Sequence, residues 1–222
     1  MKILFATSHF GFLRNFEPAL RLLAKRGHVI HLTADRGESI GGTVTAEKLA
    51  RDYPNITFSR APNPKTRKWY ELSMAIRLTL DYWRYLDPRF DSSPKLKTRA
   101  AHQASRVAVS IGNLPIIGHR HIRFLQGALK TIERSIPYSQ STKRFIETHN
   151  PDVLLITPLL YFGSSQVDYV RAARSLGIPS ILCVGSWDHL TTKGLIHDVP
   201  DWVTVWNEAQ RREARELHAV PD

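Results

Sequence analysis

Polar and ionisable side chains follow directly after the apolar, strand-like run KILFAT at the start of the chain, in the segment SHFGFLRN. An imidazole changes its protonation near neutral pH, so His9 could act as a general base. Gly11 would let the backbone turn tightly, and the amides at the start of the next helix could hold an anion. Arg14 and Asn15 would extend this substrate-binding set. A structural His9, hydrogen-bonded to a neighbouring loop, remains the alternative.

A second polar segment, VGSWDHLTTKG, comes after another buried strand candidate, SILCV. Its threonines and Lys193 could present donors to a phosphate or to sugar hydroxyls, and Asp188 could orient His9 if the two segments converge. Turn and cap roles for Asp188 and Thr191 remain the alternative. The candidate substrate-binding residues here are Ser186, His189, Thr191, Thr192 and Lys193, beside a candidate catalytic Asp188.

Several chemistries have no motif in this chain. GxGxxG, a P-loop, a G-x-S-x-G elbow and a paired-carboxylate signature are all missing from the sequence. The histidines at positions 119 and 121 have no further metal ligand at a suitable spacing. The sequence therefore predicts no metal site and no cofactor bound by this chain itself.

The two polar segments need elements that bring them together. Six short runs rich in Val, Ile and Leu alternate with helical patterns, as in strands buried on both faces of a parallel sheet. We expect helices at Asn15–Arg26, Ser164–Leu176 and Asn207–Leu217, with one more ending before Pro151. The expected fold is α/β, a doubly wound, mostly parallel sheet in which ligands bind at the carboxyl ends of the strands. The expected strands are Lys2–Thr7, His28–Ala34, Ile56–Ala61, Asp152–Thr157, Pro179–Val184 and Trp202–Trp206.

The middle of the chain, about residues 65–135, shows helical periodicity and almost no strand pattern. We expect a helical insert here, with helices over residues 72–86, 95–111 and 119–136 and a loop at 112–118. Aromatic residues alternate with arginines in this insert. Either its aromatics pack inward and its charges are solvated, or it forms a basic amphipathic face for a membrane or a lipid acceptor. The residues concerned are Trp69, Tyr82, Trp83, Tyr85, Phe124, Arg77, Arg84, Arg99, Arg106, Arg120 and Arg123.

The formal net charge of +11 points to an anionic partner: nucleic acid, a membrane surface or a phosphorylated substrate. No zinc-finger, RNA-recognition or helix-turn-helix pattern supports nucleic acid, which is the least favoured of the three. The single cysteine and the lack of a signal peptide or membrane span predict a cytoplasmic protein, at most peripheral at the inner face of the membrane.

The opening KILFATSHFGFLRNFEPALRLLAKRGHVIHLTAD resembles the first βαβ unit of two-lobed GT-B glycosyltransferases. The segments PDVLLITP, GIPSILCVGSWDHLTTKG and PDWVTVWNEAQRREARELH resemble the closing part of the same N-terminal lobe. The resemblance is to bacterial surface-polysaccharide transferases, including relatives of CDP-glycerol glycerophosphotransferases and UDP-N-acetylglucosamine 2-epimerases. It covers about half of the chain and leaves the insert unmatched.

The resemblance implies that His9 deprotonates an acceptor hydroxyl and that an acidic residue, Asp188, steadies it. It implies that this lobe holds a sugar or lipid-linked acceptor, while a donor-binding lobe or partner subunit supplies the nucleotide-sugar. That lobe does not follow Asp222 in this sequence, so we expect negligible transferase activity from the chain alone. Two alternatives stay open: a non-catalytic subunit that recruits a partner to the membrane, and half of a nucleotide-sugar 2-epimerase.

Overall fold

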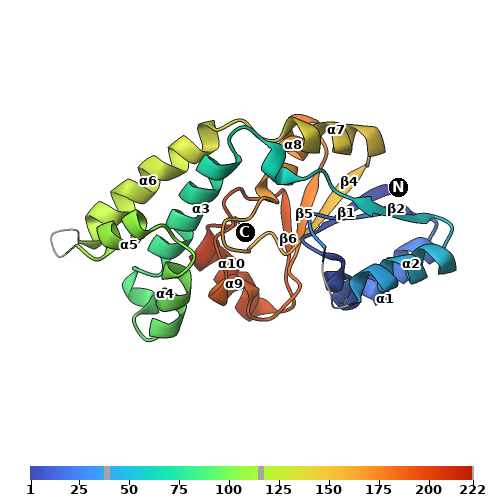
Figure 1. Cartoon of the computed structure of the whole chain (residues 1–222). Coiled ribbons are helices and arrows are strands. Elements are labelled where there is room, and N and C mark those ends of the chain that lie inside the picture. The colour runs from blue at the N-terminus through green and yellow to red at the C-terminus, as the bar shows by residue number, and fades with distance from the viewer. Residues whose placement is uncertain (38–40, 115–117, 222) are drawn as a thin grey trace.

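Six parallel strands form one sheet in the order β3-β2-β1-β4-β5-β6 (Figure 1). The computed structural model describes residues 1–37, 41–114 and 118–221. The strand order and the flanking helices make this a Rossmann-like α/β fold, which confirms the predicted fold class. The strands are β1 (Lys2–Thr7), β2 (Val29–Ala34), β3 (Ile56–Arg60), β4 (Val153–Thr157), β5 (Ser180–Cys183) and β6 (Trp202–Thr204).

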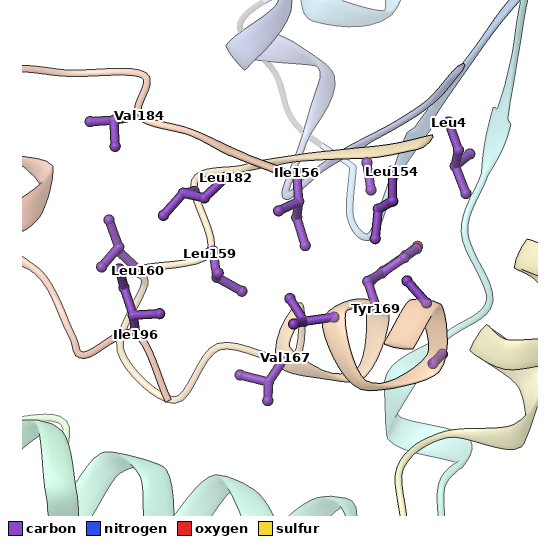
Figure 2. Packing of buried hydrophobic residues seen from close by; sticks show 14 of the residues in the cluster. Leu4, Leu154, Ile156, Leu159, Leu160, Val167, Tyr169, Leu182, Val184 and Ile196 are labelled. Atoms are coloured by element: carbon purple, nitrogen blue, oxygen red, sulfur yellow. The ribbon is translucent and has the colours of Figure 1, made fainter. Parts of the chain in front are cut away.

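Alternating side chains of the strands fill a separate core on each face of the sheet. Leu4 of β1 joins Leu154, Ile156 and Leu182 on one face, whereas Ile3 belongs to the cluster on the other face. Figure 2 shows the first cluster, where strand side chains lie against Val167 and Tyr169 of a helix. Burial on both faces explains the consecutive apolar residues by which the strands were predicted.

Helices cover both faces, as a doubly wound sheet requires. α1 (Leu13–Lys25) and α2 (Gly42–Asp52) pack on one face, and α7 (Gln140–His149), α8 (Val167–Ser175), α9 (His189–Thr192) and α10 (Glu208–His218) pack on the other. The predicted helices agree with α1, α8 and α10 within about three residues, a normal error for helix ends. α2 was not among the helices named from the sequence.

The insert between β3 and β4 consists of helices in its described part. Figure 1 shows them grouped beyond one side of the sheet. The predicted helix over residues 95–111 is in fact two helices, because Ser105 starts a new one by accepting a hydrogen bond from the Ala108 amide at 3.2 Å. The elements are η2 (Pro64–Thr66), α3 (Tyr70–Arg84), η3 (Pro88–Phe90), α4 (Pro94–Ala101), α5 (Arg106–Gly112) and α6 (His119–Ser135). Of the predicted loop at 112–118, residues 115–117 lie outside the described residues.

Neither interpretation of the insert's surface holds in full. Trp83, Tyr82 and Tyr85 are buried, as inward packing requires, but Phe124 is 75% exposed. Arg77 and Arg84, which were expected among the solvated charges, are buried as well. Buried acceptors bind both guanidinium groups, although Arg77 Nη2 and Arg84 Nε find no hydrogen-bond partner among the described residues.

A buried ion network joins the insert to α8. Arg77 donates to Glu133 Oε1 at 2.7 Å and to the Ser164 carbonyl at 2.8 Å. Glu133 also accepts a hydrogen bond from Arg171 of α8, and Arg171 pairs with Asp198 at 2.8 Å. The network fixes the insert against the sheet domain through paired charges rather than through apolar packing alone. Within the described ranges, no helix has the length and apolar character needed to span a membrane.

Candidate functional site

A cleft of about 630 Å³ opens at the carboxyl ends of the four strands β1 to β4. The helices that follow β1 and β4 pack on opposite faces of the sheet, so the cleft lies at the switch point of the strand order. Ligands of doubly wound folds bind at this position. The walls come from Ser8, Asp35, Arg36, Gly37, residues 60–61 and 63–65, Tyr70 and Met74 of α3, and residues 161–166.

Three cationic side chains, Arg36, Arg60 and Lys65, line this cleft. The Arg36 guanidinium carbon lies 5.3 Å from the centre of the Tyr161 ring. The Arg60 guanidinium lies so close to Gly37 that a Cβ there would be 3.2 Å from its Nη atoms. In the described ranges, no acidic residue forms an ion pair with any of these three cations. The described walls of the cleft therefore carry more positive than negative side chains, a balance that favours an anion.

Asp35 is an acidic residue of the same cleft and directly follows β2. Burial raises the pKa of this carboxyl to about 7, with Tyr169 of α8 and then Arg36 opposing the rise and the nearby Asp168 adding to it. Its neighbour on α8, Tyr169, has a pKa raised well above its usual value, mainly by burial. Asp35 can therefore exchange a proton near neutral pH at the wall of the cleft.

The segment after β1 brings His9 close to this cleft. Ser8 lines the cleft, and its amide donates to the Thr157 carbonyl of β4 at 3.1 Å. The half-buried His9 ring lies 4.7 Å from the ring of Phe12, measured between centroids. Phe12 in turn lies 5.9 Å from Tyr161, which lines the cleft. One aromatic ring thus separates His9 from a residue of the cleft wall.

The anion-binding role of Gly11 stays a prediction, and the structure places Gly11 in a 3-10 turn, η1 (Phe10–Phe12), just before α1. Gly11 is buried and has no left-handed backbone conformation. The start of α2 lies directly over it, since a Cβ on Gly42 would be only 2.2 Å from the Gly11 nitrogen. Gly42 is thus required for close approach of two backbones, and Gly11 belongs to that contact. Arg14 is exposed at the start of α1.

Polar side chains of the turn after β5 form hydrogen bonds within the turn itself. Asp188 accepts from Ser186 Oγ at 2.6 Å and from Thr192 Oγ1 at 2.9 Å, and its carboxylate lies 3.5 Å from Lys193 Nζ. Burial alone would raise the pKa of Asp188, but these hydrogen bonds and the lysine charge outweigh it and lower the pKa to about 2. Thr191 Oγ1 donates to the Asp188 carbonyl at 3.2 Å.

The insert also closes this turn from the outside. Arg84 of α3 donates to the carbonyls of Leu190 at 2.6 Å and Gly194 at 2.9 Å, and the Tyr85 hydroxyl donates to the Lys193 carbonyl at 2.6 Å. These bonds satisfy carbonyls at the end of the short helix α9. The residues predicted to bind substrate here, Ser186 to Lys193, are absent from the walls of the cleft.

The two predicted segments nevertheless lie at the same edge of the sheet and touch. Asn15 Nδ2 donates to the Gly185 carbonyl at 2.8 Å. The buried His189 ring lies 6.0 Å from Phe12, the ring that also contacts His9. Burial lowers the pKa of His189, although Asp188 opposes this. The hydrogen bonds given above for Asp188 stay within its own turn, and its role in orienting His9 remains a prediction.

Sequence analysis missed the residues that form most of the cleft: Asp35, Arg36, Arg60, Lys65 and Tyr161. The signal was present, since Asp35 and Arg36 directly follow β2 and Arg60 ends β3. The rule that ligands bind at strand ends was applied to the polar segments after β1 and β5, whereas the cleft lies over β1 to β4.

Across the described parts of the chain, no group of three or more His, Cys, Asp or Glu side chains could hold a metal ion. No family model matches the sequence, and no match was found among the curated proteins.

Proposed function

We propose that this chain is the acceptor-binding lobe of a nucleotide-sugar-dependent glycosyltransferase of the GT-B type, acting in cell-surface polysaccharide or glycolipid synthesis. The observation that carries the proposal is the cationic cleft at the switch point of a Rossmann-like sheet, with a histidine beside its wall. A ligand in this cleft would lie at the carboxyl ends of the strands, where the fold can present loops and side chains to it.

In this mechanism His9 accepts the proton of an acceptor hydroxyl as that oxygen attacks the anomeric carbon of the donor sugar. The bond from that carbon to the nucleotide oxygen breaks, and the nucleotide leaves with the bonding electron pair. Attack from the opposite side inverts the anomeric centre. A donor-binding lobe or partner subunit would hold the nucleotide and stabilise its departing negative charge. This chain contributes the acceptor site and the base.

The proposal predicts which ligands the chain alone binds. In calorimetric titrations, a short-chain prenyl phosphate or a sugar phosphate should bind with measurable heat, because the cationic cleft belongs to this lobe. UDP-N-acetylglucosamine should bind at least about tenfold more weakly, equivalent to about 1.4 kcal/mol, and should not be turned over.

Preferential binding of the nucleotide-sugar would contradict the assignment of this lobe to the acceptor. Conversion of UDP-N-acetylglucosamine to its 2-epimer without an added acceptor would support the epimerase alternative instead. Arg26→Gln is a suitable control variant, since Arg26 is exposed just after α1 and is not among the residues that line the cleft.

A second function, recruitment of a partner to an anionic membrane, is favoured by the outer surface of the insert. From Ser92 to Ile132 the sequence holds seven lysines and arginines and no acidic residue. Phe124 on α6 and Val107 on α5 are 75% and 68% exposed in this stretch. Exposed apolar side chains among cations are typical of surfaces that bind anionic lipid.

Vesicle sedimentation tests this second function. The chain should sediment with vesicles that contain phosphatidylglycerol, not with phosphatidylcholine alone, and about 1 M salt should release it because screening then acts within about 3 Å. The double variant Arg120→Ala/Arg123→Ala should weaken binding about tenfold or more, at about 1 kcal/mol for each charge removed.

Phe124→Ser should weaken vesicle binding further. Trp187→Ser should not weaken it, although Trp187 on the β5 turn is equally exposed, at 74%. Equal sedimentation with both kinds of vesicle, or equal losses from both aromatic variants, would rule out membrane recruitment through this surface.

A further inference from the structure

We propose that the cleft binds a phosphate or an equally charged anionic group through Arg36, Arg60 and Lys65, and that Asp35 takes up a proton when this group binds. The inference rests on the proposed function in taking the cleft as the acceptor site, and it names the chemical class of the acceptor. It also adds Asp35, which the proposed transfer step does not use, as a group that changes its protonation.

The cations carry the first part of the inference. Three positive side chains from the segments after β2 and β3 line one cleft, and none forms an ion pair with an acidic residue of the described ranges. Other arginines of this chain behave differently: Arg67, Arg77 and Arg171 all pair with buried carboxylates. Three cations that form no ion pair with a described carboxylate, and that have Asp35 as their acidic neighbour, fit a ligand that brings further negative charge.

The surroundings of Asp35 carry the second part. This carboxyl lines the same cleft, so an anion bound there meets a like charge unless Asp35 is protonated. Tyr169 of α8 and Arg36 favour the charged form of Asp35, whereas burial and Asp168 of α8 disfavour it. Tyr70 of α3 also interacts with Asp35. The pKa of Tyr70 is raised first by burial, then by Glu71, and to a smaller extent by Asp35.

These opposing neighbours leave Asp35 near its titration point, with a pKa of about 7. A bound anion adds a negative charge near Asp35 and therefore favours the protonated form of its carboxyl. By linkage, the anion must then bind more tightly as the pH falls through this range. The direction of the effect is fixed: proton uptake accompanies binding, and alkaline conditions oppose it.

Sulfate is the probe that tests this coupling, because its charge is constant between about pH 5.5 and 8.5, unlike that of phosphate. In calorimetric titrations of the whole chain, sulfate affinity should rise about tenfold as the pH falls across this range. A like-charge interaction of about 1.4 kcal/mol produces this factor. Asp35→Asn should bind sulfate tightly at every pH, and its affinity should lose most of the pH dependence.

Two cation variants test the site itself. Arg60→Gln should lower sulfate affinity about tenfold, which corresponds to losing one charge-assisted hydrogen bond. Lys65→Gln should weaken binding as well, and because Lys65 is exposed this variant does not depend on the stability of the fold. Arg26→Gln should bind as the unaltered chain does.

Several outcomes overturn the inference. If Arg60→Gln and Lys65→Gln leave the sulfate affinity unchanged, the anion does not bind in the cleft. A pH dependence that survives in Asp35→Asn but disappears in His9→Gln assigns the proton to the imidazole instead.

Competition by glucose 1-phosphate but not by farnesyl phosphate would identify a sugar phosphate as the source of the anion, and the reverse would identify a lipid phosphate. Sugar transfer and its loss in His9→Ala are measured separately from sulfate binding, so the anion site can fail while the transfer step stands, and the reverse.

Discussion

Replacing Asp81 with alanine should lower the free energy of unfolding by about 3 to 5 kcal/mol, a large part of the stability of an ordinary domain. Asp81 lies on α3, is fully buried, and accepts from the backbone amides of Gly163 at 2.8 Å and Leu195 at 2.7 Å. His197 Nε2 lies 3.0 Å from the same carboxylate. Alanine would remove this acceptor from the buried amide of Gly163 and from the partly buried amide of Leu195.

The loss at Asp81 matters for function because the two amides belong to segments that border the site. Gly163 follows β4 and lines the cleft, and Leu195 follows the turn that carries Asp188. The Asp81 carboxylate therefore fixes the insert to both segments at once. Chemical denaturation in urea, followed by circular dichroism, measures the change in stability.

Asp91→Ala is the matched control for this experiment, because Asp91 is an exposed residue of the same insert and its replacement should stay within about 0.5 kcal/mol. A loss below about 1 kcal/mol for Asp81→Ala would show that water readily replaces the carboxylate. It would mean that the insert is held to the sheet domain by its other contacts.

The fold was predictable because its signals are local. Consecutive Val, Ile and Leu residues in short runs require burial on both faces, and helices between such runs require a parallel, doubly wound sheet. The same local logic identified the end of α7, where Asn150 takes a left-handed conformation just before Pro151. Local patterns did not reveal that Ser105 divides one predicted helix into α4 and α5, because the apolar spacing continues across it.

The site was predictable only in part, because its decisive contacts join residues far apart in the chain. Arg77 and Arg84 have the same residue type as solvated arginines, and only their partners, such as Glu133 and the Leu190 carbonyl, show that they are structural. Ser186 and the threonines after β5 looked like ligand donors, yet the structure uses their hydroxyls within the turn. These bonds within the turn are local, and the sequence offered them as the alternative interpretation. It carried no signal for the distant partners of Arg77 and Arg84.

His9→Ala should lower the rate of sugar transfer by about 10²- to 10⁴-fold, the usual contribution of a general base. The measurement uses the transferase that the proposal predicts, in which this chain is combined with the proposed donor-binding lobe or partner subunit. His9 lies next to Phe12 at the end of β1, one ring from the cleft wall, so alanine there removes the imidazole without altering the cationic residues of the cleft. Acceptor affinity, measured by titration, should therefore change little.

A second histidine variant controls for the general effect of losing an imidazole. His102→Ala changes an exposed residue just after α4, and its transfer rate should equal that of the unaltered enzyme. The proposed function predicts that kcat falls in His9→Ala alone while acceptor binding persists. Equal kcat values for His9→Ala and the unaltered transferase would contradict the proposal that this histidine takes the acceptor's proton.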